Sequence, residues 1–199
     1  MPIRRGSISC SRFVIEGGIP KDVKKWLTHA LKRHAFEPID PKGDEERVAG
    51  FVELEDENAT GFAAGTLFQG EHAVFSWRVD KIRIPGATVR AELQAFAQKY
   101  EAKNGRPPSR GQKNEQKELI RRGLRSKTAA VTKTSDVSLD LKSKEVLVWA
   151  SSVAVVDEVF SALEQGLETR LLARTPQALL DPKVLESLSP TPELFGSAS

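Results

Sequence analysis

The stretch that determines the fold most clearly is residues 72–86, which read HAVFSWRVDKIRIPG. Ala73, Phe75, Trp77 and Val79 alternate with the residues between them, and this period of two indicates a half-buried β-strand over 72–84. Pro85-Gly86 ends that strand. Shorter strand-like runs over 51–54 and 61–68 precede it, each followed by turn-forming residues. Together these runs predict a β-meander.

Two helices follow the meander. The first covers about 87–103 and ends at Asn104-Gly105, where glycine permits the left-handed turn that closes many helices. Arg106-Pro107-Pro108 then forces an extended connection, because proline disfavours a helical conformation in the residue before it. Ser109 is a suitable N-cap for the second helix, over about 110–125.

Strands and helices also flank this central part. One helix, opened by Ile19-Pro20, places Val23, Leu27 and Leu31 on one face. The remaining predicted elements are strands over 7–15, 128–133, 137–141, 145–150 and 167–173, and helices over 153–166 and 175–188.

Strand runs that alternate with helices in this order indicate an α+β fold, with antiparallel β-meanders packed against amphipathic helices. We expect a β-rich α+β region over 1–85. A region containing the helix pair, a β-hairpin and a further helix follows over 86–190, and a disordered tail over 191–199.

Composition excludes several classes of protein. The chain has 199 residues, 39% of them hydrophobic, and no apolar run long enough to span a membrane. The first residues lack the apolar segment of a secretory signal. Cys10 is the single cysteine, which rules out an internal disulfide and a cysteine-rich zinc module. The expected compartment is therefore the cytoplasm.

Charge is strongly segregated along the chain although the net charge is only +3. Residues 99–133 contain eleven Lys and Arg against three Glu, a local charge of +8. Residues 37–57 contain two basic residues against nine acidic ones, a local charge of −7. Segregation of this kind indicates an anionic partner for the basic block.

The basic residues of the second helix form a regular stripe. They are spaced by three or four residues, so they share one helical face over about 22 Å. Such a stripe fits a row of phosphates, although a solvated face partly offset by Glu115 and Glu118 would have the same pattern. Gln112, Asn114 and Gln116 are of the types that read base edges, but no helix-turn-helix pattern accompanies them. The stripe consists of Arg110, Lys113, Lys117, Arg121 and Arg125.

Catalytic interpretations have weaker support. Glu53, Glu55 and Asp56 could hold Mg²⁺ in a nuclease, although a solvated acidic turn looks the same in sequence. Cys10 with His29, His34 or His72 could supply a thiol nucleophile, but a lone cysteine in a strand is more often a core residue. The sequence contains no phosphate-binding glycine loop, dinucleotide fingerprint or zinc-protease motif. We assign no catalytic, cofactor-binding or metal-binding residue.

An ordered set of motifs resembles the recombination-associated protein RdgC family. It begins with Glu101, Gly105-Arg106, Arg110 and Lys113, and it continues through 119–126, Val131 and Ser151-Ser152. The similarity covers residues 82–167, and His34-Ala35-Phe36 extends it more weakly into residues 7–81. Two features depart from the family pattern: Ile8 to Phe13 replace its opening aromatic motif, and the chain resembles only the N-terminal two thirds of longer members.

The resemblance implies a nucleoid protein that binds DNA without sequence specificity. Family members form a ring-shaped homodimer around duplex DNA and limit the access of the RecA recombinase to DNA. The family is also labelled an exonuclease, and a metal-dependent exonuclease is one alternative. Another is a protein-interaction module in which the basic helix contacts the acidic loop 37–57 of a second copy.

The leading hypothesis is a dimeric, cytoplasmic DNA-binding protein of the nucleoid that contacts the phosphates of duplex DNA. We predict that the DNA-binding residues are Arg106, Arg110, Lys113, Lys117, Arg121, Arg122, Arg125 and Lys127, together with Lys24 and Lys25.

Overall fold

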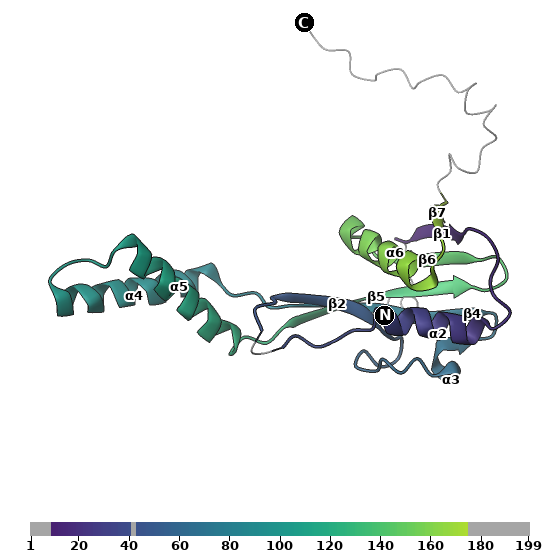
Figure 1. The fold of residues 1–199 in the computed structure, drawn as a ribbon, viewed down its shortest axis with the longest axis horizontal. Helices are drawn as coiled ribbons and strands as arrows, with labels where there is room; N and C mark the ends of the chain where they lie inside the picture. The colour runs from purple at the N-terminus through teal and green to yellow at the C-terminus, as the bar shows by residue number, and fades with distance from the viewer. Residues whose placement is uncertain (1–8, 41–42, 175–199) are drawn as a thin grey trace, which may run out of the picture.

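The computed structural model describes residues 9–40 and 43–174, and its strands form one antiparallel sheet of seven strands. The strand order is β2-β4-β5-β6-β1-β7, and the two-residue strand β3 pairs with β4 outside this path (Figure 1). The strands are β1 (Ser11–Ile15), β2 (Arg47–Glu53), β3 (Phe68–Gln69), β4 (His72–Lys81), β5 (Val131–Asp140), β6 (Glu145–Trp149) and β7 (Leu171–Ala173). The α+β fold class predicted from sequence is confirmed.

Strands β4 and β5 are the longest, and they connect the two parts of the molecule. They pair along their whole length, from His72 opposite Asp140 to Lys81 opposite Val131. The helices α4 (Gly86–Asn104) and α5 (Arg110–Arg125) are inserted between these strands. The helix pair therefore projects from one end of the sheet and gives the molecule an elongated shape (Figure 1).

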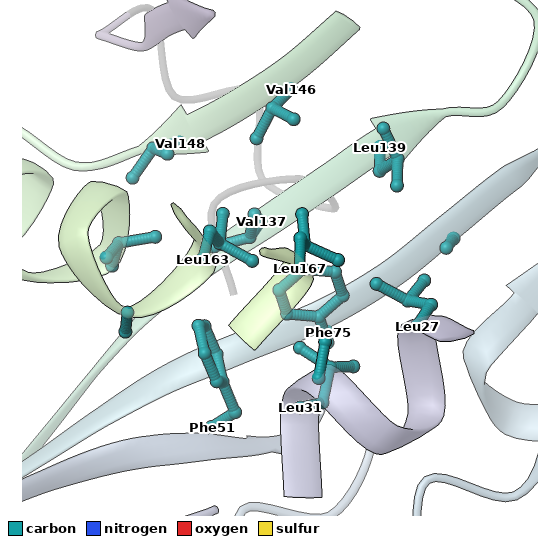
Figure 2. Packing of buried hydrophobic residues seen from close by; sticks show 14 of the residues in the cluster. Leu27, Leu31, Phe51, Phe75, Val137, Leu139, Val146, Val148, Leu163 and Leu167 are labelled. Carbon is teal, nitrogen blue, oxygen red and sulfur yellow. The ribbon is translucent and has the colours of Figure 1, made fainter. Parts of the chain in front are cut away.

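The main core lies between one face of the sheet and the helices α2 (Val23–Arg33) and α6 (Val153–Leu167). Phe51 of β2 packs against Phe75 and Trp77 of β4, with ring centroids 5.4 and 4.7 Å apart. Figure 2 shows Leu31 of α2 and Leu163 of α6 among the side chains of this cluster. The alternation seen in residues 72–84 thus places Phe75 and Trp77 on the helix-covered face.

The opposite face of β4 is also largely buried, whereas the sequence predicts a strand with one exposed face. Ser76 is 3% exposed and donates a hydrogen bond of 2.9 Å to the fully buried carboxylate of Asp136. Arg78, on the same face, donates hydrogen bonds to the carbonyl of Glu57 and the side chain of Asn58. The acidic turn after β2 is thereby held over this part of the sheet.

Helices α2 and α6 approach each other closely at Gly166. A Cβ atom at this position would lie 2.8 Å from the carbonyl oxygen of Ala30, which is too close for any side chain. The indole of Trp26 donates a hydrogen bond of 3.2 Å to the carbonyl of Leu167, and Arg33 pairs with Glu168 at 2.5 Å. These contacts fix the two helices as one layer.

Several predicted elements differ from the structure. The strand predicted over 61–68 is wrong, because its small residues form the short helix α3 (Ala64–Leu67) and strand pairing begins only at Phe68. The strands predicted over 128–133 and 137–141 are one continuous strand, β5, because its polar centre pairs with β4. The predicted helix 175–188 and the tail 191–199 lie outside the described residues.

The strands on both sides of the boundary predicted after residue 85 belong to the same sheet. The inserted helix pair stands apart from the sheet in space (Figure 1). Of the helices in the described ranges, none has the length and apolar character needed to cross a bilayer.

Candidate nucleic-acid interface

The start of α5 is held by a complete capping box. The Ser109 hydroxyl accepts a hydrogen bond from the Gln112 backbone N–H, and the Gln112 side-chain oxygen accepts one from the Ser109 N–H. The prediction that Ser109 is the N-cap is therefore confirmed. Gln112 also donates a hydrogen bond of 2.9 Å to the Tyr100 hydroxyl of α4, which fixes the two helices relative to each other.

The connection between the helices begins at Gly105. This residue has φ 65°, in the left-handed region, and its N–H bonds to the carbonyl of Glu101 to close α4. Arg106 belongs to the bend that follows α4, and Pro107-Pro108 lead from it into α5 without forming helix or strand. The basic helix is consequently presented from a structured turn.

The connection before α5 and the N-terminal half of that helix carry exposed cations. Arg106, Arg110, Lys113 and Lys117 are all exposed, and none has an ion pair with a described residue. Arg110 to Lys117 span about 10 Å of helix. Since duplex DNA carries one negative charge per about 1.7 Å of its axis, this surface is long enough to face several phosphates.

The C-terminal half of α5 contacts the acidic segment of the same chain instead. Arg121 pairs with Glu46 at 2.9 Å, and Arg122 lies 3.7 Å from Asp44. These residues surround a cavity of about 300 Å³ that Glu118 also lines. Acidic and basic blocks that are far apart in sequence therefore neutralise each other here.

Arg125 completes this contact and is 7% exposed. Its guanidinium donates hydrogen bonds to three backbone carbonyls, those of Asp40 at 2.9 Å, Glu45 at 2.6 Å and Gly43. A buried guanidinium held in this way is not accessible to a phosphate. Arg125 has the helical spacing of the stripe, but the structure gives it the role of anchoring the acidic segment.

A second anchor holds the later acidic turn. Arg78 forms two hydrogen bonds to Asp80, of 2.8 and 2.7 Å, and its guanidinium lies 4.3 Å from the centroid of the Phe36 ring. The hydrogen bond from Arg78 is the main reason that the pKa of Asp80 is lowered.

Burial and the charge of Arg33 lower the pKa of His34, which follows α2.

Three more cations lie where the strands enter the helix pair, and the sequence interpretation missed their grouping. Lys81, Arg83 and Lys133 line a cavity of about 210 Å³ together with Val79 and Val131. Lys81 is opposite Val131 and Lys133 is opposite Val79, so the two lysines are diagonal neighbours on one face of the β4–β5 pair. The period of two in β4 continues beyond Val79, so the sequence could have indicated that Lys81 lies on this face. It could not indicate Lys133, because β5 begins about 50 residues later in the chain.

Lys24 and Lys25 lie on a different surface. They belong to α2, which is at the opposite end of the long axis from α5 (Figure 1). Lys25 lies 3.5 Å from the carboxylate of Asp22. One molecule of this chain therefore does not bring these lysines together with the stripe on α5. Lys127, by contrast, is exposed just after α5.

The carboxylates considered for a nuclease do not form a metal site. Glu53 and Glu55 border a cavity of about 230 Å³ with Glu57, but Glu53 accepts a hydrogen bond from the Ala63 N–H. Asp56 accepts one from the Asn58 N–H. Within residues 9–40 and 43–174, no group of three or more His, Cys, Asp or Glu side chains is placed to hold a metal ion.

The thiol considered for nucleophilic catalysis is half-buried immediately before β1. No hydrogen bond joins Cys10 to His29, His34 or His72 in the described part of the chain.

A protein-family model described as "Putative exonuclease, RdgC" matches residues 13–184 of the chain. No curated protein matches. The matched range includes the whole sheet from Phe13 onwards, the inserted helix pair and α6.

Proposed function

Because the chain belongs to the RdgC family of recombination-associated nucleoid proteins, we propose that it binds DNA through the helix pair, without sequence specificity. The observation that carries this proposal is the exposed row of Arg106, Arg110, Lys113 and Lys117. Arg110, Lys113 and Lys117 repel one another along the helix, so an anion that neutralises them is favoured. We call these four residues the α5 cation row.

Contact with phosphates explains the chemistry of the α5 cation row better than contact with bases does. Reading adenine edges uses amide side chains that are free to form paired hydrogen bonds, and these accompany Arg or Lys contacts to guanine. Gln112 is instead engaged in the capping box and with Tyr100. Phosphate contacts alone give affinity that depends on salt and tolerates any sequence.

We favour duplex DNA as the ligand. Binding of single strands without sequence preference commonly uses exposed aromatic side chains on which bases stack. The aromatic residues of the helix pair, Phe96 and Tyr100, are half-buried and pack against each other with ring centroids 5.9 Å apart. The helix pair thus offers charge without a stacking surface.

We propose further that the protein is a homodimer in the nucleoid and that it limits RecA access to DNA. Exposed apolar surface on the helix pair supports self-association. Leu119 is 61% exposed, and among the described residues the two helices bury only two apolar side chains, those of Val89 and Ile120. Competition for DNA would follow directly from coverage of the phosphates. Light scattering with and without DNA measures the mass, and RecA loading onto DNA already coated with the protein measures the competition.

DNA binding itself is tested by fluorescence anisotropy with labelled DNA over a range of salt concentrations. The proposal predicts equal affinity for two unrelated duplexes of the same length, a steep decrease in affinity with salt, and weaker binding to a single strand. A protein that fails to bind duplex DNA at low salt, or that strongly prefers one of the two sequences, would contradict it.

A further inference from the structure

A second basic surface lies on the body of the molecule, on α2 and the segment beside it. A cavity of about 550 Å³ opens there, lined by Lys24, Lys25, Thr28, His29, Lys32, Gly61, Phe62 and Ala64. It is an open depression on the surface rather than an enclosed pocket. We call it the α2 cavity.

One face of a single helix supplies most of the lining. Lys24, Thr28 and Lys32 are each four residues apart, so they follow one another along the helix beside the cavity. The adjoining side of α2 is buried in the core through Leu27 and Leu31. The cations therefore sit on a rigid helix, with their positions fixed by core packing.

The cations of the α2 cavity are poorly neutralised by the protein. Lys24 and Lys32 are exposed and have no carboxylate within ion-pair distance among the described residues. Asp22 is the nearby acid, and it caps α2 by accepting a hydrogen bond from the Lys25 N–H. A positive potential thus remains around the cavity, and it would attract a negatively charged partner.

The floor of the cavity is built from small and apolar groups. Ala64 and the Gly61-Phe62 segment lie opposite the helix, and lysine stems add methylene groups along the rim. Phe62 has φ 49°, a conformation that is uncommon for a bulky residue, and its side chain is 1% exposed. The surrounding structure therefore holds this floor in a fixed shape.

We propose that the α2 cavity binds an acidic peptide segment of a partner protein, with an apolar side chain in the cavity and carboxylates on Lys24, Lys25 and Lys32. A nucleic acid fits less well, because Phe62, the one Phe, Tyr or Trp side chain of the lining, is buried and offers no surface on which a base could stack. The cations also surround a short depression rather than following a line of phosphates. This proposal is independent of DNA binding by the α5 cation row.

The probe for this proposal is a fluorescein-labelled peptide, Asp-Asp-Leu-Phe-Asp-Asp, measured by anisotropy against the full chain. Two control peptides separate the two parts of the recognition: Asn replaces every Asp in one, and Ser-Ser replaces Leu-Phe in the other. We expect saturable binding of the first peptide only, with affinity decreasing as salt increases. Absence of saturable binding, or equal binding of the Ser-Ser peptide, overturns the proposal.

Variants of the protein locate the binding. Combined Lys24→Ala, Lys25→Ala and Lys32→Ala should weaken peptide binding by about tenfold or more, since charge pairs at interfaces contribute strongly to recognition. Ala64→Trp should also weaken it by filling the cavity without changing charge, and Ala64→Leu provides a milder replacement if the tryptophan disturbs α3. The matched control removes Arg110, Lys113 and Lys117, and it should leave peptide affinity unchanged.

A single-stranded oligonucleotide provides the competing case. If it displaces the peptide and its own binding is lost in the Lys24, Lys25 and Lys32 variant, the α2 cavity is a nucleic-acid site and the peptide proposal is wrong. If the oligonucleotide does not displace the peptide, and the two sets of lysine variants affect the two ligands separately, the proposal is supported.

Discussion

Removal of three cations from the α5 cation row is the most direct test of the DNA interface. The substitutions are Arg110→Ala, Lys113→Ala and Lys117→Ala, all at exposed positions of one helix. Alanine has the highest helix propensity, so the helix should persist. The capping box of Ser109 and Gln112 is untouched, and the contact between Arg121 and Glu46 also remains.

The expected loss follows from the number of phosphate contacts. Each contact contributes about 0.9 to the slope of log K against log salt concentration, so three lost contacts reduce that slope by about 2.7. Between about 1 M and about 0.15 M salt this amounts to about 2.2 logarithmic units, or roughly a 160-fold loss of affinity at the lower concentration. The corresponding free energy is about 3 kcal/mol.

The assay is anisotropy of a labelled duplex with wild-type and variant protein at several salt concentrations. A matched control removes three cations at the other end of the molecule: Lys24, Lys25 and Lys32. Both variants change the net charge by the same amount, so general electrostatic attraction affects them alike. Only in the α5 variant should the slope of log K against log salt concentration decrease and the affinity for duplex DNA fall.

Two results would refute this reasoning. Equal losses in the two variants would mean that net charge, and not the position of the cations, determines binding. An unchanged slope in the α5 variant would mean that the α5 cation row does not contact phosphates. Equal thermal unfolding of both variants and the wild type excludes misfolding as the cause.

Three predictions concern the anchors and helix packing, measured by chemical denaturation. Arg125→Met should reduce the free energy of unfolding by about 2–3 kcal/mol, since three carbonyl contacts are lost, and hydrogen exchange should increase over residues 43–46. Asp80→Asn should cost about 3 kcal/mol at neutral pH, because it breaks a largely buried pair with Arg78. The folded-state pKa of Asp80 is lowered, so its contribution is complete above the ordinary value of 3.8 and disappears as the pH falls through the lowered pKa. The difference between wild type and variant should therefore shrink in acid, and a constant difference would refute that cause. Gly166→Val should cost about 2–3 kcal/mol by forcing α6 away from Ala30, whereas Gly123→Ala, with nothing within 4 Å, should be neutral or stabilising.

Local patterns in the sequence predicted much of the fold. The period of two in residues 72–84 identified β4, and the signals at Gly105 and Ser109 identified where α4 ends and α5 begins. These features depend on neighbouring residues, so they can be read without knowledge of the fold. Residues 61–68 were misassigned because short runs containing alanine and glycine have no strong preference between helix and strand.

The sequence alone determined that this chain has a basic helix of regular spacing, a segregated acidic segment and the motifs of its family. It could not determine which cations of the helix remain available to a ligand. Arg125 and Lys117 share the same stripe, but Arg125 is buried against the carbonyls of Asp40, Gly43 and Glu45, and Lys117 faces solvent. Helical spacing determines on which side of its own helix a side chain lies. Whether that side chain is buried or neutralised depends on other segments of the chain, and only the tertiary fold brings those segments together. The same reason explains the α2 cavity, whose lysines form a site only because residues 61–64 pack beside them.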